Sequence, residues 1–336
     1  MQTPSPALVN INYFMFTNET MNTIKQLDTV NTRIDLIDNS PVQNWWENIS
    51  KICIFPPRKV ETIIDTIEQS LKNNCPIPII ISLCPAINNL KSPNDKGQTR
   101  ELVQLTCDNQ RLNLFIEELF DLNKLTFETL GVPLETMLVF ADVLENGANK
   151  MFTNVDKWQE IASISAKNIS QAFLNFDGDR PGEFQKTKFK VPKVRLQSNV
   201  LMQAGKANLK HEDELKKVEL ECLDPNTQTF DLFIKHLKLT ADTPFVTTGF
   251  QTIKSAETVW NRVRFMLAQC TADGVVLPKM FKEMHKKSFK ENILDPIFIC
   301  STTRLGGVEL EMDAFEKSGN PSMAIFRNIG SWMKEN

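Results

Sequence analysis

The stretch PIPIIISLCPAINNLKSPNDKGQTR, residues 76–100, decides the fold. Its first part, IPIIISL, is continuously apolar, and such a run is typical of a strand that is covered on both faces. Its second part is a polar loop that contains Lys91 and Arg100. In an open parallel sheet, ligands bind beyond the carboxyl ends of the strands. The stretch therefore predicts an inner parallel strand followed by a ligand-binding loop.

Amphipathic helices are predicted on both sides of this strand. Residues 58–74 and 109–131 carry apolar side chains at helical spacing, and Gly131 suits the position just after a helix end. A second apolar strand is expected at 134–143, and residues 155–176 again have a helical period. This alternation of strands and helices indicates an α/β fold whose first half contains a mainly parallel, Rossmann-like sheet with crossover helices.

The remaining segments set the expected domain organisation. Residues 1–175 are predicted to form the α/β core unit, with further strands at 7–16 and 51–55. Residues 176–200, rich in charge, Gly and Pro, indicate a charged loop or a boundary. Residues 201–336 are expected to be a less regular α+β part that completes the same large domain.

Within that last part, three elements are expected. Residues 255–274 have the period of an amphipathic helix, and residues 295–302 resemble a last strand. Gly306 and Gly307 indicate the turn of a hairpin. The acidic stretch VELEMDAFEKSGN that follows is expected to be a charged, solvated segment.

Composition excludes several classes of function. The 336 residues include 38 basic and 41 acidic side chains, so no global field attracts nucleic acid or an acidic membrane. The seven cysteines form no CxxC pair and only three histidines are present, which gives no metal-site spacing. No apolar run reaches the length of a membrane span. We expect a cytoplasmic protein with a small-molecule substrate and no metal; the cofactor and the oligomeric state are left open.

The candidate site residues follow the ends of three predicted strands. Asp142 closes an apolar strand, where a carboxylate must be paired, solvated or bound to a ligand. It is predicted to be a catalytic base or the anchor of a substrate amine, or else a cap of the next turn. Glu145 is the second predicted catalytic acid. The predicted substrate-binding residues are Ser82, Lys91, Arg100, Arg180 and Arg304.

Arg180 belongs to a basic stretch with interleaved aromatic residues, 180–195. Three interpretations stay open for this stretch. It binds an anionic substrate, it binds single-stranded nucleic acid, or it is a solvated hairpin. Cys84 and Cys300 also follow apolar strands, but a nucleophilic thiol needs a neighbouring base, and the three histidines all lie beyond residue 210.

The layout of residues 76–158 resembles that of the isocyanide synthases that act on amino acids. The shared features are the strand and loop IIISLCPAINNLKSPNDKG, the acidic helix FIEEL, and the strand that closes on an acid in MLVFADVLENGANKMFTNVDKW. The resemblance covers about a quarter of the chain. Here VLENGA follows the acid instead of a Gly. The resemblance implies a small, charged, amino-acid-like substrate.

These features together predict an enzyme that acts on a small polar substrate, anionic or amino-acid-like, by group transfer or lyase chemistry. Its site is expected in a crevice at the carboxyl ends of the strands. The alternative is a non-catalytic binding protein, such as a secreted bacterial effector that engages a host partner. It is motivated by the lack of a GxSxG, GxGxxG or P-loop motif.

Overall fold

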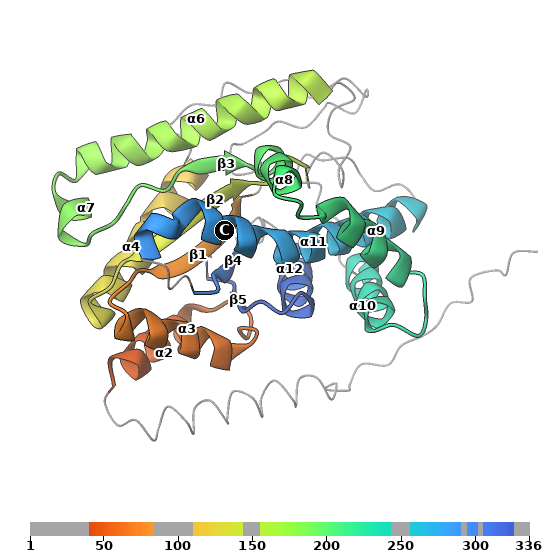
Figure 1. Cartoon of the computed structure of the whole chain (residues 1–336), viewed down its shortest axis with the longest axis horizontal. Helices are drawn as coiled ribbons and strands as arrows, with labels where there is room; N and C mark the ends of the chain where they lie inside the picture. Colours follow the sequence, from red (N-terminus) through yellow and green to blue (C-terminus); the bar gives the residue numbers. More distant parts are fainter. Residues whose placement is uncertain are drawn as a thin grey trace, which may run out of the picture. The chain divides into compact units, whose positions relative to one another are not determined.

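A five-stranded sheet forms the centre of the computed structural model, which describes residues 40–83, 110–143, 155–242, 256–289, 294–301 and 305–325. Every strand runs parallel to its neighbours, in the order β3-β2-β1-β4-β5 (Figure 1). The strands are β1 (Ile77–Leu83), β2 (Leu134–Phe140), β3 (Val194–Leu196), β4 (Ile297–Ser301) and β5 (Ser322–Met323). The predicted mixed α/β class with a parallel sheet is confirmed.

The strand β1 occupies the middle of the sheet, as its continuous apolarity predicts. It pairs with β2 on one side and with β4 on the other. Its isoleucines are all buried, because helices cover both faces of the strand. The flanks of the sheet are formed by the much shorter strands β3 and β5.

Helices from the first half of the described chain cover one face of the sheet. They are α2 (Pro41–Ile52), α3 (Val60–Lys72), α4 (Gln110–Leu130) and α6 (Val155–Asp179). The helix α3 packs on β1, α4 packs on β2, and α2 and α6 pack on α4. Gly131 ends α4 with a positive φ of 76°, as the sequence predicts for the position after a helix end.

Helices from the second half cover the opposite face. They are α8 (Gln197–Lys206), α11 (Ala256–Phe289) and α12 (Leu305–Lys317). Their apolar side chains form one core with Ile80 of β1, Val139 of β2 and Phe298 of β4. Since side chains alternate between the two faces of a strand, Ile79 and Ile81 point to the face that α3 and α4 cover.

A second core, formed mainly by helices, lies next to this sheet. The helices α9 (His211–Glu221) and α10 (Gln228–Asp242) pack against α11 and α12. The core contains Val218, Phe233, Leu267 and Leu310. Figure 1 shows α9 and α10 beyond the end of β3 at which α8 begins, whereas α7 (Glu183–Lys186) lies at the other end of that strand.

Several sequence predictions need correction. Residues 51–55 do not form a strand, because α2 extends to Ile52 and irregular backbone follows. Residues 176–200, predicted to be a charged loop or a boundary, contain α7 and the edge strand β3. Gly306 and Gly307 do not make a hairpin turn but lie in the first turn of α12. The strand predicted at 7–16 lies outside the described residues.

The second half is also more regular than expected. The part expected to be less regular α+β adds β4 and β5 in parallel to the sheet that β1 and β2 begin. The sheet therefore takes strands from all three segments into which the sequence was divided, 1–175, 176–200 and 201–336. The domain boundaries themselves stay a prediction.

Candidate functional site

The carboxyl edge of the sheet brings the ends of β1 and β2 together. Leu83 is in register with Phe140, and the backbone N–H of Ala141 donates to the Leu83 carbonyl at 3.0 Å. Asp142 is the next residue, and Ser82 lies on the neighbouring strand in register with Val139. Ser82 and Asp142 therefore lie at the same edge of the sheet, the edge where parallel sheets bind ligands.

Asp142 is buried, with only 1% of its surface exposed, and it contacts the N-terminus of α8. The helix has Leu196 at its N-cap, a side chain that cannot accept a hydrogen bond. Asp142, two residues past the end of β2, takes this role: its Oδ1 accepts from the Ser198 backbone N–H at 3.0 Å. Burial raises the pKa of Asp142, and the hydrogen bonds from Ser198 and Gln197 only partly offset this effect.

A buried polar network continues from the first residue of α8. Gln197 Nε2 donates to Asp273 Oδ2 at 2.6 Å, and Gln269 Nε2 donates to Asp273 Oδ1 at 3.0 Å. His211 Nε2 lies 3.1 Å from the same Oδ1. We call these residues the carboxyl-edge network: Asp142, Gln197, His211, Gln269 and Asp273. All five are buried, although one follows β2 and the others come from α8, α9 and α11.

This network contains the groups that proton transfer requires. His211 Nε2 lies 3.1 Å from Asp273 Oδ1 and 3.0 Å from Gln269 Nε2, so these two side chains fix the orientation of the imidazole ring. Asp142 is a second carboxyl group, and burial raises its pKa above the usual range of an aspartate. An imidazole and two acids therefore stand at the carboxyl ends of β2 and β3.

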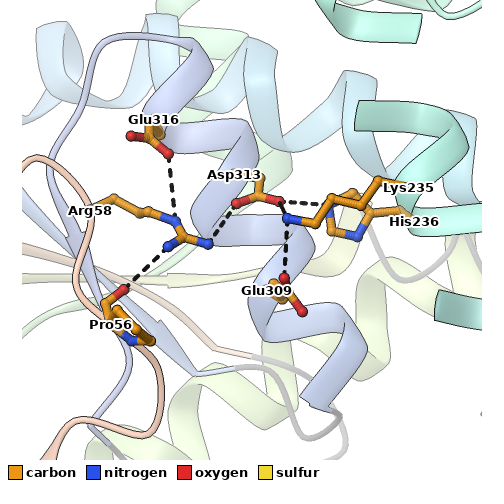
Figure 2. Close-up of polar contacts among 7 residues, drawn as sticks. All are labelled: Pro56, Arg58, Lys235, His236, Glu309, Asp313 and Glu316. Atoms are coloured by element: carbon orange, nitrogen blue, oxygen red, sulfur yellow. Dashed lines mark hydrogen bonds and ion pairs between the residues drawn. The ribbon is translucent and has the colours of Figure 1, made fainter. Parts of the chain in front are cut away.

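A second buried Asp–His pair joins α12 to α10 and is drawn in Figure 2. Asp313 Oδ2 lies 2.9 Å from His236 Nε2 and 2.7 Å from Lys235 Nζ, both on α10. Asp313 Oδ1 lies 2.9 Å from the Arg58 guanidinium, which precedes α3. We call this group the Asp313 cluster: Arg58, Lys235, His236, Glu309, Asp313 and Glu316.

The charges of the Asp313 cluster compensate one another. Burial opposes ionisation of Asp313, but the hydrogen bond from His236 and the charges of Lys235 and Arg58 outweigh it and hold its pKa well below the usual range. Asp313 and Glu309 in turn raise the pKa of Lys235. The cluster thus ties α10, α12 and the segment before α3 together, as expected of a structural ion-pair network.

A third group lies at the opposite, amino-terminal end of β2. Glu135 accepts from His285 Nδ1 and from Lys190 Nζ, each at 2.9 Å. Burial alone would raise the pKa of Glu135, but these two partners lower it to about 2. His285 has non-helical backbone angles inside α11, and its ring stacks on Phe281 with a centroid distance of 4.5 Å. This group lies away from the edge where the predicted site residues gather.

The structure separates the predicted substrate-binding residues. Arg180 follows α6, pairs with Glu117 at 2.8 Å and stacks on Phe176. It precedes α7 by three residues, and Figure 1 shows α7 at the end of β3 away from α8, the helix that Asp142 caps. Ser82 lies at the carboxyl edge. The other predicted site residues lie outside the described residues: Lys91, Arg100, Glu145 and Arg304.

Cys300 has a structural role and not that of a nucleophile. Burial raises its pKa well above that of an ordinary thiol, so the thiol stays protonated and is a poor nucleophile. Cys84 lies outside the described residues. Within the described ranges, no three His, Cys, Asp or Glu side chains are arranged to hold a metal ion.

Sequence reasoning missed the residues that complete both Asp–His groups. Asp273 has a usable signal, since it is the only charged residue between Phe265 and Pro278 and lies one helical turn from Gln269. Asp313 also has one, because Glu309, Asp313 and Glu316 share a face at helical spacing. His211 and His236 carry no such signal, since their partners lie 62 and 77 residues away in the chain.

No protein-family model, no curated protein and no solved structure matches this chain. The comparisons therefore give no support to the resemblance to isocyanide synthases. The helices of the described ranges include none that is long and apolar enough to cross a membrane. Function has to be argued from the residues themselves.

Proposed function

We propose that the protein is an enzyme that acts on a small polar substrate, by group transfer or lyase chemistry, beyond the carboxyl edge of its sheet. The observation that carries the proposal is the carboxyl-edge network, in which Asp142, His211 and Asp273 are buried together past the ends of β2 and β3. Buried acids are costly, and perturbed carboxyl groups gather at functional sites more often than elsewhere.

The topology of the sheet supports the same location. The order β3-β2-β1-β4-β5, all parallel, agrees with the 3-2-1-4-5-6 strand order of doubly wound folds, without its sixth strand. Our proposal therefore includes the Rossmann-like assignment. The chain moves outward from β1 to β2 and β3, and then resumes on the other side of β1 with β4. Ligands of such folds bind where the order reverses, at the carboxyl ends of β1 and β4. The network lies beside that point.

In this proposal, His211 exchanges a proton with the substrate and Asp273 positions it. Asp142 holds the start of α8, and through Gln197 it links the end of β2 to Asp273. The sequence alternative was a cap of the turn directly after Asp142; instead Asp142 caps α8, and in this proposal its carboxyl group also takes part in proton exchange. The cytoplasmic location stays a prediction, as does the choice between transferase and lyase chemistry.

The experiment is a metabolite-conversion screen followed by kinetics with matched histidine variants. The full chain is incubated with a metabolite extract, and depleted compounds are identified by mass spectrometry. His211→Gln should lower kcat/KM for the converted compound by about 100-fold or more, the usual contribution of a general acid or base. His236→Gln is the matched control, because His236 is also buried and also pairs with an aspartate, but in the Asp313 cluster.

Two results would remove the proposal. One is full activity in both His211→Gln and Asp142→Asn when both variants keep the native circular dichroism spectrum. The other is a wild-type chain that converts no metabolite but captures a defined protein partner, which would favour the alternative of a secreted effector.

A further inference from the structure

Arg195 stands in the edge strand β3, one residue before the strand ends. It is in register with Val139 of β2, and Val139 belongs to the core formed with α8 and α11. Paired residues of neighbouring strands point to the same face of a sheet. The Arg195 side chain therefore lies on the face that α8 and α11 cover, close to the carboxyl edge.

The guanidinium of Arg195 lacks a counter-charge. Throughout the part of the chain that the structure describes, no hydrogen bond or ion pair joins this side chain to another residue. Arg58 and Arg180, in contrast, each pair with a carboxylate. Arg195 is nevertheless half-buried, and burial lowers its pKa with no acidic neighbour to offset the effect.

A partly buried guanidinium without a partner is unfavourable, because it loses hydration and gains no hydrogen bonds. Its five N–H groups form a planar fork that matches the oxygens of a carboxylate or phosphate. We propose that Arg195 binds an anionic group, a carboxylate or a phosphate, of the substrate that the carboxyl-edge network transforms. This inference rests on the proposed function, and it adds the charge of the substrate and the residue that recognises it.

The position of Arg195 fits a small substrate. Neighbouring strands lie about 5 Å apart, so Arg195 is close to its partner Val139 on β2, and Asp142 comes three residues after Val139, just past the end of β2. A metabolite held at its anionic end by Arg195 can therefore extend towards Asp142 and His211. Of the basic stretch 180–195 noted in the sequence, Arg195 thus takes the anion-binding role, whereas Arg180 is already neutralised by Glu117.

Calorimetric titration of the full chain tests the proposal directly. Inorganic phosphate is the probe in one arm and succinate in the other, so that the two arms distinguish a phosphate site from a carboxylate site. Losing a bidentate charged contact should raise the Kd of the preferred anion about 10- to 100-fold in Arg195→Gln. Arg195→Lys, which keeps the charge but not the fork, should bind with intermediate affinity. Arg180→Gln should bind as the wild type does.

The outcomes separate this inference from the function on which it rests. The anion site is overturned if the wild type binds neither anion, or if Arg195→Gln and Arg195→Lys bind as tightly as the wild type. Should Arg195→Gln fail to fold, Arg195→Lys alone decides. Conversion that depends on His211 but not on Arg195 would leave the enzyme in place and remove the anion site. Anion binding that depends on Arg195, without any His211-dependent conversion, would leave the anion site in place and remove the proposed enzyme.

Discussion

The protein buries two Asp–His pairs, and they differ in what surrounds the aspartate. Asp313 has Arg58 and Lys235 as direct partners in addition to His236, so its charge is fully compensated. Asp273 has two amides, Gln197 and Gln269, in addition to His211. The same pair of side chains is thus placed once among cations and once among neutral donors.

The difference indicates two purposes. A carboxylate between cations lies in a deep electrostatic minimum and resists any change of protonation, which suits a structural link between α10, α12 and the segment before α3. A histidine held by an aspartate among neutral amides has no cation competing for that aspartate, which suits the proton-transfer role that we propose for His211. The location agrees, because only the second pair lies past the carboxyl ends of β2 and β3.

Asp313→Asn should cause the largest loss of stability. The substitution leaves Arg58 and Lys235 without their shared carboxylate, and breaking a buried ion pair typically costs about 3–5 kcal/mol. Urea unfolding followed by circular dichroism measures the change. Glu316→Gln is the control in the same cluster, since Glu316 is half-exposed and lies 3.5 Å from Arg58; it should cost less than about 1 kcal/mol. Equal effects of the two variants would contradict the central role of Asp313.

Asp273→Asn should show the reverse balance between stability and activity. Its partners are neutral amides and a histidine, so the stability loss is expected to be about 1–2 kcal/mol, as for other buried hydrogen bonds. Activity should fall about 100-fold, because His211 loses the group that orients it. The pH profile of kcat for the converted metabolite should change as well, which a purely structural residue would not cause. An unchanged profile would place Asp273 among the structural residues.

The parts of the fold that follow from local pattern were predictable from the sequence. The central position of β1, the flanking helices α3 and α4, and the parallel pairing with β2 all follow from continuous apolarity and helical period. The edge strand β3 was missed because three residues in a charged context carry almost no strand signal. The helix α12 was missed because Gly306 and Gly307 suggested a turn, while burial against two cores overrides that local preference.

The candidate site was predictable only in part. Asp142 follows from a single principle, the cost of an acid at the end of an apolar strand. Its role at the start of α8 does not, because Ser198 lies 56 residues further along the chain. The same holds for His211 and Asp273, whose contact depends on how α9 packs on α11. Side chains that meet through tertiary packing leave no spacing in the sequence from which to predict them.

Acid titration should separate Asp142 from Asp313, because their pKa values are shifted in opposite directions. The pKa of Asp313 is lowered by folding, so its stabilising contribution is complete above the unfolded value, about 4, and is lost as the pH falls below it. The pKa of Asp142 is raised by burial, so its contribution is greatest below about 4 and declines as the pH rises through the folded value. Each carboxyl group thus favours folding on the opposite side of that pH.

The measurement compares each asparagine variant with the wild type at several pH values by urea unfolding. The stability deficit of Asp313→Asn should shrink as the pH falls from 6 towards about 3, whereas that of Asp142→Asn should grow. At neutral pH, Asp142→Asn should cost about 1 kcal/mol, the usual value of a helix N-cap, or less, since asparagine also caps well. Deficits that move in the same direction would refute the contrast between the two carboxyl groups.

Arg180→Gln should have the smallest effect, and it tests where the boundary of the site lies. Arg180 was predicted from the sequence to bind substrate, yet its guanidinium is half-exposed, pairs with Glu117 and stacks on Phe176 near α7. Exposed ion pairs contribute about 0–1 kcal/mol, so the unfolding free energy should change by less than about 1 kcal/mol. The kcat/KM of the converted metabolite should stay within about twofold of the wild type, since a change of one RT unit or less is expected for a residue without substrate contact. A tenfold or larger rise in KM, with stability unchanged, would show that the substrate reaches Arg180. The site would then extend well beyond the carboxyl edge of the sheet, and the location of the Asp273–His211 pair would no longer set it apart from the Asp313–His236 pair.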